Sequence, residues 1–298
     1  MTFTTTISGW GNYPKHEAQL LTPSSCVSIQ AEIRQEKTLI ARGMGRSYGD
    51  SSNAPIVLQT TYCDHFIELD YKTGQLTAEA GITLREILKV IVPRGWFLPV
   101  TPGTSYVTLG GAIASDVHGK NHHIAGTFGR HVKSMSIVLG TGEVVKASPV
   151  DNEDLFRATC GGMGLTGVII SATIQLIPIR SSLIKQKTIK ANCIKAAYEA
   201  FEENSSSTYS VAWIDCLAKG KSLGRSVLTF GEHAESGGLE LGMRDPISVP
   251  FYTPSALLNS VAMKTFNGAY WNKEKHNKTQ MVPLMPYFYP LDAIGSWN

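Results

Sequence analysis

Apolar and polar residues alternate along the chain in short runs, most of which have the period of a β-strand. Runs rich in β-branched and aromatic residues, bounded by turn-forming residues, predict strands at 38–41, 56–58, 66–70, 76–80, 132–139, 143–147, 168–177, 209–216 and 226–230. Apolar residues recur at helical spacing over 27–36 and 193–203, which predicts helices there.

Local signals mark the ends of further helices. Thr83 and Glu86 have the spacing of a capping box, and Pro93 and Gly95 would end the helix that follows, so a helix is predicted over 84–92. Helical patterns also cover 108–114, 151–159 and 255–272. The stretch 178–182 begins with a proline and predicts a boundary between a domain of residues 1–180 and one of residues 181–298.

Glycine is concentrated in one stretch from Pro102 to Gly129, PGTSYVTLGGAIASDVHGKNHHIAGTFG. Small residues surround the glycines, and four basic side chains lie among them: His118, Lys120, His122 and His123. Backbone with so few side chains can turn sharply or lets another group approach closely. We therefore expect a bulky planar cofactor with a diphosphate here, beside imidazole and ammonium groups that bind, orient or deprotonate a substrate.

Two further glycine-rich loops, 42–50 and 161–167, favour the same interpretation. The predicted strand 38–41 runs into RGMGRSYGDSS, whose hydroxyl groups and two arginines are typical of a phosphate-binding turn, although a structural turn has a similar composition. Residues 162–167 match GxGxxG, the dinucleotide fingerprint. That fingerprint needs a strand before it and a helix after it. Here a predicted helix precedes and a predicted strand follows, so we reject the match.

Composition narrows the classes of function. The 298 residues carry 27 basic and 24 acidic side chains, and a net charge of +3 is too small to indicate a nucleic-acid partner. The five cysteines are scattered without a CxxC pair, so neither a disulfide framework nor a metal site is expected. No secretory signal stands at the N-terminus, and no apolar run reaches the roughly 18 residues of a membrane helix. We expect a cytoplasmic protein, with docking on a membrane surface left open.

Three motifs together resemble a known family: RGMGRSYGD at 42–50, PGTSYVTLGGAIASDVHGKNHH at 102–123 and GGMGLTGVI at 161–169. They are similar to FAD-linked oxidoreductases of the vanillyl-alcohol-oxidase type, and most of all to the subfamily that oxidises decaprenylphosphoryl-β-D-ribose. VAWIDC at 211–216 and FYPLDAIGSWN at 288–298 extend the resemblance. It implies an α+β fold, in which a PCMH-type FAD-binding domain of two α+β subdomains over 1–180 precedes an antiparallel-sheet substrate domain over 181–298.

The resemblance also implies which residues face the cofactor and the substrate. The first loop would wrap the diphosphate, and residues of the central stretch would run along the flavin. The cofactor-binding residues implied in this way are Ala41, Arg42, Gly43, Met44, Gly45, Arg46, Ser47, Tyr48, Gly49, Asp50, Ser51, Gly103, Thr108, Leu109, Gly110, Gly111, Ser115, Asp116, Val117, His118 and Ile169. The implied catalytic residues, facing the substrate pocket, are Tyr48, His118 and Lys120, with Trp213 lining the pocket.

The chain departs from the family pattern at two places. Many relatives carry a histidine in the first loop that is bonded covalently to the flavin, but Arg46 stands at that position here, so we expect non-covalent FAD. Family members also continue for well over a hundred residues beyond the position of Asn298. We therefore expect the substrate domain to be incomplete, with a separate chain supplying the remainder or with the chain a fragment.

The function implied is oxidation of a secondary alcohol of a sugar, above all the 2′-hydroxyl of a polyprenylphosphoryl-β-D-ribose to the 2′-keto form, with hydride transfer to flavin N5. His118 would be the base or orienter and Lys120 would hold the phosphate as a point charge. A short-chain reductase would complete the epimerisation that leads to arabinose for cell-wall synthesis. The alternatives are another sugar or alditol oxidase of the same superfamily, or an inactive flavin-binding remnant. For His118 a bond that only fixes the loop, and for Tyr48 simple packing, also stay open.

Overall fold

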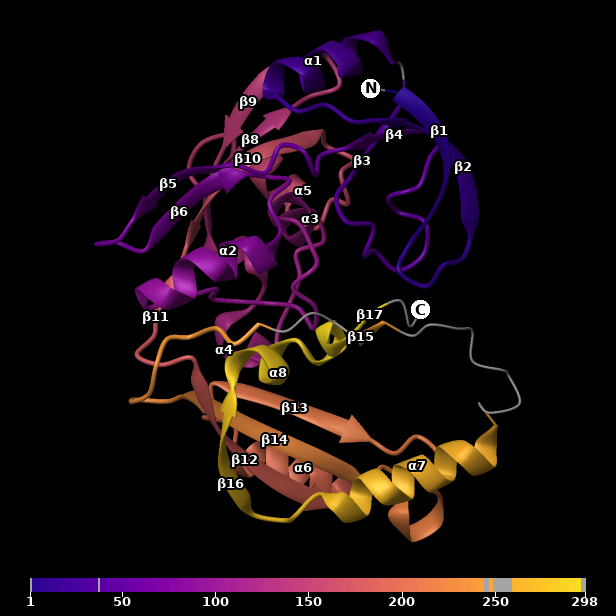
Figure 1. Ribbon diagram of the computed structural model, residues 1–298, viewed down its shortest axis with the longest axis vertical. Helices are drawn as coiled ribbons and strands as arrows, with labels where there is room; N and C mark the ends of the chain where they lie inside the picture. Colours follow the sequence, from indigo (N-terminus) through magenta and orange to yellow (C-terminus); the bar gives the residue numbers. More distant parts are fainter. Residues whose placement is uncertain (1, 37, 244–246, 249–258, 296–298) are drawn as a thin grey trace. The chain divides into compact units, whose positions relative to one another are not determined.

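The structure is a computed structural model that describes residues 2–36, 38–243, 247–248 and 259–295 (Figure 1). These residues form two compact units. The first unit runs to Pro178, and the second begins at Ile179. Because helices and largely antiparallel sheets occur in both units, the fold is of the α+β class that the resemblance implies.

One sheet of the first unit has the strand order β1-β2-β4-β3. Its strands are β1 (Thr2–Ser8), β2 (Lys15–Leu21), β3 (Ile40–Arg42) and β4 (Ile56–Gln59). β1 and β2 form an antiparallel hairpin, whereas β4 runs parallel to β2 and β3. The sequence did not predict the hairpin, because its first strand is mostly threonine and its Phe3 is half-exposed, which leaves little burial pattern.

The other sheet of the first unit has the order β5-β6-β10-β8-β9 and is antiparallel throughout. Its strands are β5 (Phe66–Asp70), β6 (Gln75–Glu79), β8 (Val132–Val138), β9 (Val144–Ala147) and β10 (Val168–Gln175). The sequence predicted each of these strands to within two residues, and the structure confirms them. A short pair, β7 (Trp96–Phe97) and β11 (Ile177–Pro178), completes the strands of the unit.

Short helices connect these strands: α1 (Cys26–Gln35), α2 (Leu84–Ile91), α3 (Leu109–Ala114), α4 (His122–Ala125) and α5 (Glu153–Thr159), with 3₁₀ turns η1 (Val92–Arg94) and η2 (Phe128–His131). The predicted cap of α2 is present, since Thr83 Oγ1 accepts from the Glu86 N–H at 3.2 Å. Gly95, at φ 80°, ends the turn that follows α2. Since α5 precedes residues 162–167 and β10 follows them, the rejection of GxGxxG is confirmed.

Helix α1 joins the two sheets of the first unit into one core. Its buried Ile29 and Ile33 pack with Leu58 of β4, and also with Val138 of β8 and Val168 of β10. Neighbouring positions on β4 point the other way, toward a second cluster formed by β1, β2 and β3. The loops at the ends of β3, β6 and β10 are therefore held by one packed body.

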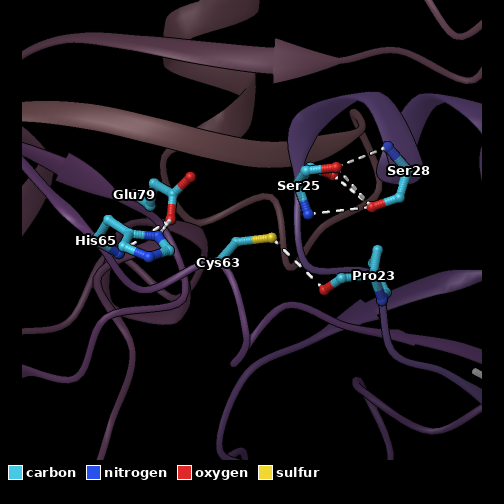
Figure 2. A network of polar contacts seen from close by, with 6 residues as sticks. All are labelled: Pro23, Ser25, Ser28, Cys63, His65 and Glu79. Carbon is cyan, nitrogen blue, oxygen red and sulfur yellow. Dashed lines mark hydrogen bonds and ion pairs between the residues drawn. The ribbon is translucent and has the colours of Figure 1, made fainter.

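A polar network surrounds the start of α1 (Figure 2). Ser25 and Ser28 form a capping box, with the Ser28 N–H donating to Ser25 Oγ at 3.2 Å and the Ser25 N–H to Ser28 Oγ at 3.0 Å. The thiol of Cys63 donates to the carbonyl oxygen of Pro23, and burial raises the pKa of Cys63 to about 11. Cys63 therefore stays a neutral thiol that ties the chain before α1 to the loop after β4.

Glu79→Gln is expected to lower the pKa of His65. The hydrogen bond that Glu79 Oε2 accepts from His65 Nδ1 (2.7 Å) and the carboxylate charge raise the pKa of this exposed imidazole (Figure 2). A raised pKa in the folded state means that the pair adds stability below the ordinary pKa of about 6.5 and loses it as the pH rises through the raised value. Proton NMR titration of the imidazole measures the shift. Asp64→Asn should lower the pKa less, since Asp64 is the smaller cause; equal shifts in the two variants would contradict the assignment.

The second unit is built on an antiparallel sheet of order β13-β14-β12-β16. Its strands are β12 (Leu183–Ala191), β13 (Tyr209–Ile214), β14 (Ser226–His233) and β16 (Lys278–Pro283). Helix α6 (Ile194–Glu203) covers one face through Ala197 and Ala200, which pack with Leu228 and Phe230. The opposite face carries Tyr209, which contacts Phe288 of α8 (Leu284–Phe288) with ring centroids 4.8 Å apart.

Further elements of the second unit are α7 (Ser260–Lys273), η3 (Gly220–Ser222), η5 (Pro290–Ala293) and the parallel pair β15 (Ile247–Ser248) and β17 (Ile294–Gly295). The predicted helix 255–272 corresponds to α7, although residues 255–258 lie outside the described residues, as do 296–298 of the last motif. The sequence did not predict β12, whose lysines interrupt the apolar pattern, or β16, which begins with three polar residues. No helix in the described ranges is long and apolar enough to cross a membrane.

Candidate cofactor and substrate site

The three glycine-rich segments of the sequence meet in the first unit. Gly43 directly follows β3 and lies so close to Thr108, the N-cap of α3, that a Cβ atom on Gly43 would collide with the threonine hydroxyl. Gly164 of the third segment lies beside β3, where its Cβ would be 3.5 Å from Ile40 Cδ1. At Gly43 the absence of a side chain is what allows Thr108 to lie this close.

The third segment also closes the end of α3. The Gly161 N–H donates to the carbonyl oxygen of Ile113 at 3.1 Å, and the Met163 N–H donates to that of Ala114 at 2.9 Å. Both donors have positive φ, 80° for Gly161 and 51° for Met163. The segment is therefore wrapped against the last turn of α3, whose carbonyl groups would otherwise lack partners.

The two adjacent glycines of α3 face different surroundings. The Gly110 N–H donates to the carbonyl oxygen of Ala80 at 2.8 Å, and a Cβ on Gly110 would lie 3.0 Å from the Ala80 methyl group. A Cβ on Gly111 would have one neighbour within 4 Å among the described residues, Thr108 Oγ1 at 3.0 Å. Gly110 therefore packs α3 against the residue that follows β6, whereas Gly111 leaves a surface of α3 open to a ligand.

The loop after β3 presents a run of backbone N–H groups. In the part of the chain that the structure describes, residues 44–51 donate no hydrogen bond from these groups. Gly45 and Gly49 have positive φ values of 63° and 71°, which turn the backbone back on itself. Successive amides in such a conformation form a concave site for an anion.

Asn53 adds a side-chain donor to the same loop. Its Oδ1 accepts from Arg42 at 2.8 Å, while its Nδ2 is buried and has no hydrogen-bond partner among the described residues. A buried donor without a partner costs free energy, so it indicates a ligand that supplies an acceptor. The N–H groups of residues 44–51 that donate no hydrogen bond, here called the open amides, fit the diphosphate of FAD together with this donor. The surface of α3 at Gly111, which has no side chain, fits its ring system.

Arg42 bonds to the protein itself. Its Nη1 donates to Ser52 Oγ at 3.1 Å and to Asn53, and its Nη2 donates to the carbonyl oxygen of Ser8 at 2.6 Å. Burial, and to a smaller extent the charge of Arg46, lowers the pKa of Arg42. Arg42 therefore ties the end of β1 to the end of the loop, and its contact with the cofactor stays a prediction. Arg46 is exposed and donates only to the carbonyl oxygen of Met44 among the described residues.

Arg42→Ala is expected to lower the free energy of unfolding of the first unit by about 2 kcal/mol, because it removes charge-assisted hydrogen bonds and leaves half-buried acceptors unmatched. Arg46→Ala, at an exposed position in the same loop, should change stability by less than about 0.5 kcal/mol. Urea unfolding followed by circular dichroism compares the two variants. Equal losses in both would contradict the structural role of Arg42.

The predicted substrate-facing residues lie in two loops. Tyr48 is 85% exposed, and its ring meets the edge of Trp10 at a centroid distance of 6.0 Å. His118 is exposed in the segment between α3 and α4, and its ring lies 5.5 Å from that of His122. Lys120 is half-buried, and burial lowers its pKa. A partly desolvated ammonium group gains more from an anionic partner than one in bulk water.

Several other predicted cofactor residues are involved in the protein's own packing. Leu109 of α3 is fully buried, and Ile169 of β10 is 6% exposed. Asp116 has a positive φ of 41°, and its Oδ1 accepts from the Gly129 N–H at 2.7 Å. The Ser115 N–H donates to the carbonyl oxygen of Gly111 and caps α3, whereas Gly103 is exposed before that helix. Trp213 lies in the second unit, on β13, with its ring 4.7 Å from that of Tyr270.

The sequence interpretation missed three residues around the first loop. Asn53 lies just beyond the motif, and its orphan amide is visible only in three dimensions. Gly9 and Trp10 stand in the turn of the hairpin and contact the loop at Ser47, Tyr48 and Gly49. No local pattern connects that turn to a loop more than thirty residues later. Within the described ranges no group of three His, Cys, Asp or Glu side chains that could hold a metal ion occurs.

The chain is similar in sequence to a family of FAD-binding domains and to several known proteins. Residues 18–148 match the family described as FAD binding domain. Decaprenylphosphoryl-beta-D-ribose oxidase of Mycolicibacterium smegmatis is 33% identical over 100% of this chain and 69% of its own length. A putative D-arabinono-1,4-lactone oxidase of Neurospora crassa is 28% identical over 52% of this chain, and human Delta(24)-sterol reductase is 28% identical over 45% of it. These matches span 29% and 27% of the two proteins.

The match to the Mycolicibacterium smegmatis oxidase covers the whole chain, including the three glycine-rich segments that the structure brings together. The matched domain begins in β2 and ends just after β9, so it contains the loop of open amides and the whole of α3. The chain belongs to the FAD-dependent oxidoreductase family that includes decaprenylphosphoryl-β-D-ribose oxidase, and it carries that family's FAD-binding domain.

Proposed function

We propose that this chain binds FAD non-covalently and serves the oxidation of a polyprenylphosphoryl-β-D-ribose at its 2′-hydroxyl, giving the 2′-keto sugar. The observation that carries the proposal is the similarity over the full chain to an oxidase named for such a substrate. The convergence of the three glycine-rich segments supports it, because they leave open amides and a surface without side chains in the matched domain. The family's reaction needs such a cradle for the cofactor.

The residues that would hold FAD follow from the geometry of the first unit. The N–H groups of residues 44–51 and the Asn53 amide would donate to the diphosphate, and the open side of Gly111 would lie along the ring system. When bound, FAD accepts a hydride at N5. Non-covalent binding follows from Arg46, which is exposed and has no nucleophilic atom at the position where relatives attach the flavin.

His118 and Lys120 would act on the substrate. An imidazole can accept the proton of the sugar hydroxyl, or hold that hydroxyl by a hydrogen bond, near neutral pH. The half-buried ammonium group of Lys120, two residues away, would bind the phosphate as a point charge. Tyr48 would form part of the pocket wall, where its exposed ring is available to a ligand.

The proposal includes two partners. The 2′-keto product must be reduced to complete an epimerisation, and a short-chain reductase would supply that step. The polyprenyl chain of the substrate would keep the protein in peripheral contact with a membrane surface, since a long lipid does not leave the bilayer.

The test begins with the colour of the purified chain. Yellow protein whose flavin is released by heat supports non-covalent FAD. Anaerobic bleaching by a polyprenylphosphoryl-β-D-ribose, and not by free alditols, supports the substrate. A colourless chain that takes up no added FAD would overturn the proposal.

A second candidate is oxidation of a free sugar, sugar lactone or alditol. It is favoured by the similarity to a putative D-arabinono-1,4-lactone oxidase, which is confined to about half of the chain. The same anaerobic experiment separates the two candidates. Bleaching by a free lactone or alditol, with none by the lipid-linked ribose, would establish the second candidate instead.

A further inference from the structure

The turn of the β1–β2 hairpin is built against the first glycine-rich loop. A Cβ atom on Gly9 would collide with the carbonyl oxygen of Gly49 and would lie 2.8 Å from that of Ser47. The Trp10 N–H donates to the same Ser47 oxygen at 3.0 Å. The turn therefore touches the loop through its backbone, at a place where no side chain fits between them.

Two side-chain contacts lie on either side of this backbone contact. Arg42 Nη2 donates to the carbonyl oxygen of Ser8, the last residue of β1, at 2.6 Å. The edge of the Trp10 ring meets Tyr48 with an interplanar angle of 72°. Tyr48 is 85% exposed, and Trp10 provides its aromatic contact within the described residues.

We propose that the turn at Gly9 and Trp10 positions residues 47–49 for FAD, with Trp10 as the positioning residue for Tyr48. This inference rests on the proposed function, because it assigns the loop to FAD. Trp10 itself acts through the loop.

The physical reason is the cost of ordering a loop. The N–H groups of residues 44–51 form no hydrogen bonds to the described part of the chain, so backbone hydrogen bonds donated by the loop do not fix its shape. Fixing such a backbone when the ligand binds costs conformational entropy at every residue that becomes ordered. A turn that holds three of these residues beforehand removes part of that cost and strengthens binding.

The hairpin turn supplies a matched pair of glycine variants. Gly9→Ala places a methyl group against the Gly49 carbonyl, and we expect it to weaken FAD binding by about tenfold or more. Gly11→Ala, two residues later, has no heavy atom within 4 Å of the new methyl group among the described residues and should leave FAD binding unchanged. Titration of the apoprotein with FAD, followed by flavin fluorescence, measures both dissociation constants.

The role of the Trp10 ring is tested by a double-mutant cycle with Tyr48. Trp10→Ala and Tyr48→Ala should each weaken FAD binding by about threefold to tenfold, as expected for one aromatic contact. The double variant should be no weaker than the worse single variant, since both remove the same contact. Trp10→Phe should restore most of the affinity, and Tyr13→Ala, at an 81% exposed ring of the same turn, should have no effect.

Two results would overturn the inference: equal FAD affinity in the Gly9 and Gly11 variants, or full additivity of the Trp10 and Tyr48 effects. Thermal unfolding of each apoprotein shows whether a variant is folded. Amide hydrogen exchange at residue 10, whose N–H donates to the Ser47 carbonyl oxygen, provides a measurement without FAD. Should the wild-type chain bind no FAD, the proposed function fails. Faster exchange in Gly9→Ala and Trp10→Ala than in Gly11→Ala would still support positioning of the loop, and equal exchange would refute it.

Discussion

Leucine in place of Gly111 is expected to give a folded chain that takes up no FAD. A Cβ at this position meets only Thr108 Oγ1 within 4 Å among the described residues, at 3.0 Å, so the first atom of the new side chain requires only a small shift of that hydroxyl. The leucine would occupy the surface of α3 that we assign to the flavin. A cofactor that binds by close approach to backbone cannot share that space. Loss of the flavin absorbance at about 450 nm measures the effect.

Gly110 provides the control for this experiment. Its Cβ would lie 3.0 Å from the Ala80 methyl group and 3.2 Å from the Ala80 carbonyl oxygen, so Gly110→Leu should destabilise the first unit by overpacking, at a cost of about 1–3 kcal/mol. Gly111→Leu should unfold at nearly the temperature of the wild-type apoprotein. Undiminished absorbance in a folded Gly111→Leu chain would show that FAD does not lie along this side of α3.

Asp215→Ala is expected to be the most destabilising single change in the second unit. Asp215 follows β13 and is 3% exposed. Its Oδ2 accepts from Arg225 Nε at 2.8 Å and Nη2 at 2.6 Å, and its Oδ1 accepts from Asn267 of α7 at 2.7 Å. Removing one partner of a buried pair leaves the other charge without compensation, so we expect a loss of about 3–5 kcal/mol in the free energy of unfolding.

The exposed pair Arg180–Glu235 of the same unit is the matched control. Its atoms are 2.7 Å apart, but both side chains are more than three-quarters exposed, so Glu235→Ala should cost less than about 1 kcal/mol. Urea unfolding followed by tryptophan fluorescence gives both values. Similar losses in the two variants would mean that burial of Asp215 contributes nothing.

The stability supplied by Asp215 should also depend on pH. Burial alone would raise the pKa of Asp215, but hydrogen bonds from Arg225, Leu217 and Asn267 and the charge of Arg225 hold it below its ordinary value. A depressed pKa in the folded state contributes stability above the ordinary value of about 3.9, and this is lost as the pH falls through the folded-state value. The difference between the wild-type chain and Asp215→Ala should therefore shrink below about pH 4.

Much of the fold of the first unit was predictable, because the strands of the β5-β6-β10-β8-β9 sheet can be recognised from short stretches of sequence. β5 and β6 are joined by a Thr73–Gly74 turn, and β8 and β9 by a Thr141–Gly142 turn. β6, β8 and β10 also carry buried apolar residues of their own. The hairpin β1–β2 was not predictable in the same way. Its first strand is specified by pairing with β2, in the register Ile7 to His16, rather than by apolar residues of its own.

The same contrast holds in the second unit. α6 has helical spacing, and the sequence predicted it to within one residue. β12 lies in the middle of its sheet, yet its lysines at 185, 187 and 190 give it a polar appearance. Lysine can occupy a strand when its stem packs and its ammonium group reaches a partner, as Lys190 does over the Trp271 ring at 4.4 Å. That partner comes from α7, far along the chain.

The family, the α+β class and the three segments of the candidate cofactor site can be recognised from the order of amino acids alone, because glycine-rich backbone leaves a local and distinctive pattern. The contacts that each residue of those segments makes depend on how the chain folds. Folding turned the guanidinium of Arg42 toward Ser8 and Asn53, packed Gly110 on Ala80 while leaving Gly111 open, and brought Gly9 and Trp10 to the loop. These roles depend on which atoms lie within a few ångströms after folding. Such distances are set by the packing of distant elements, which no local pattern records.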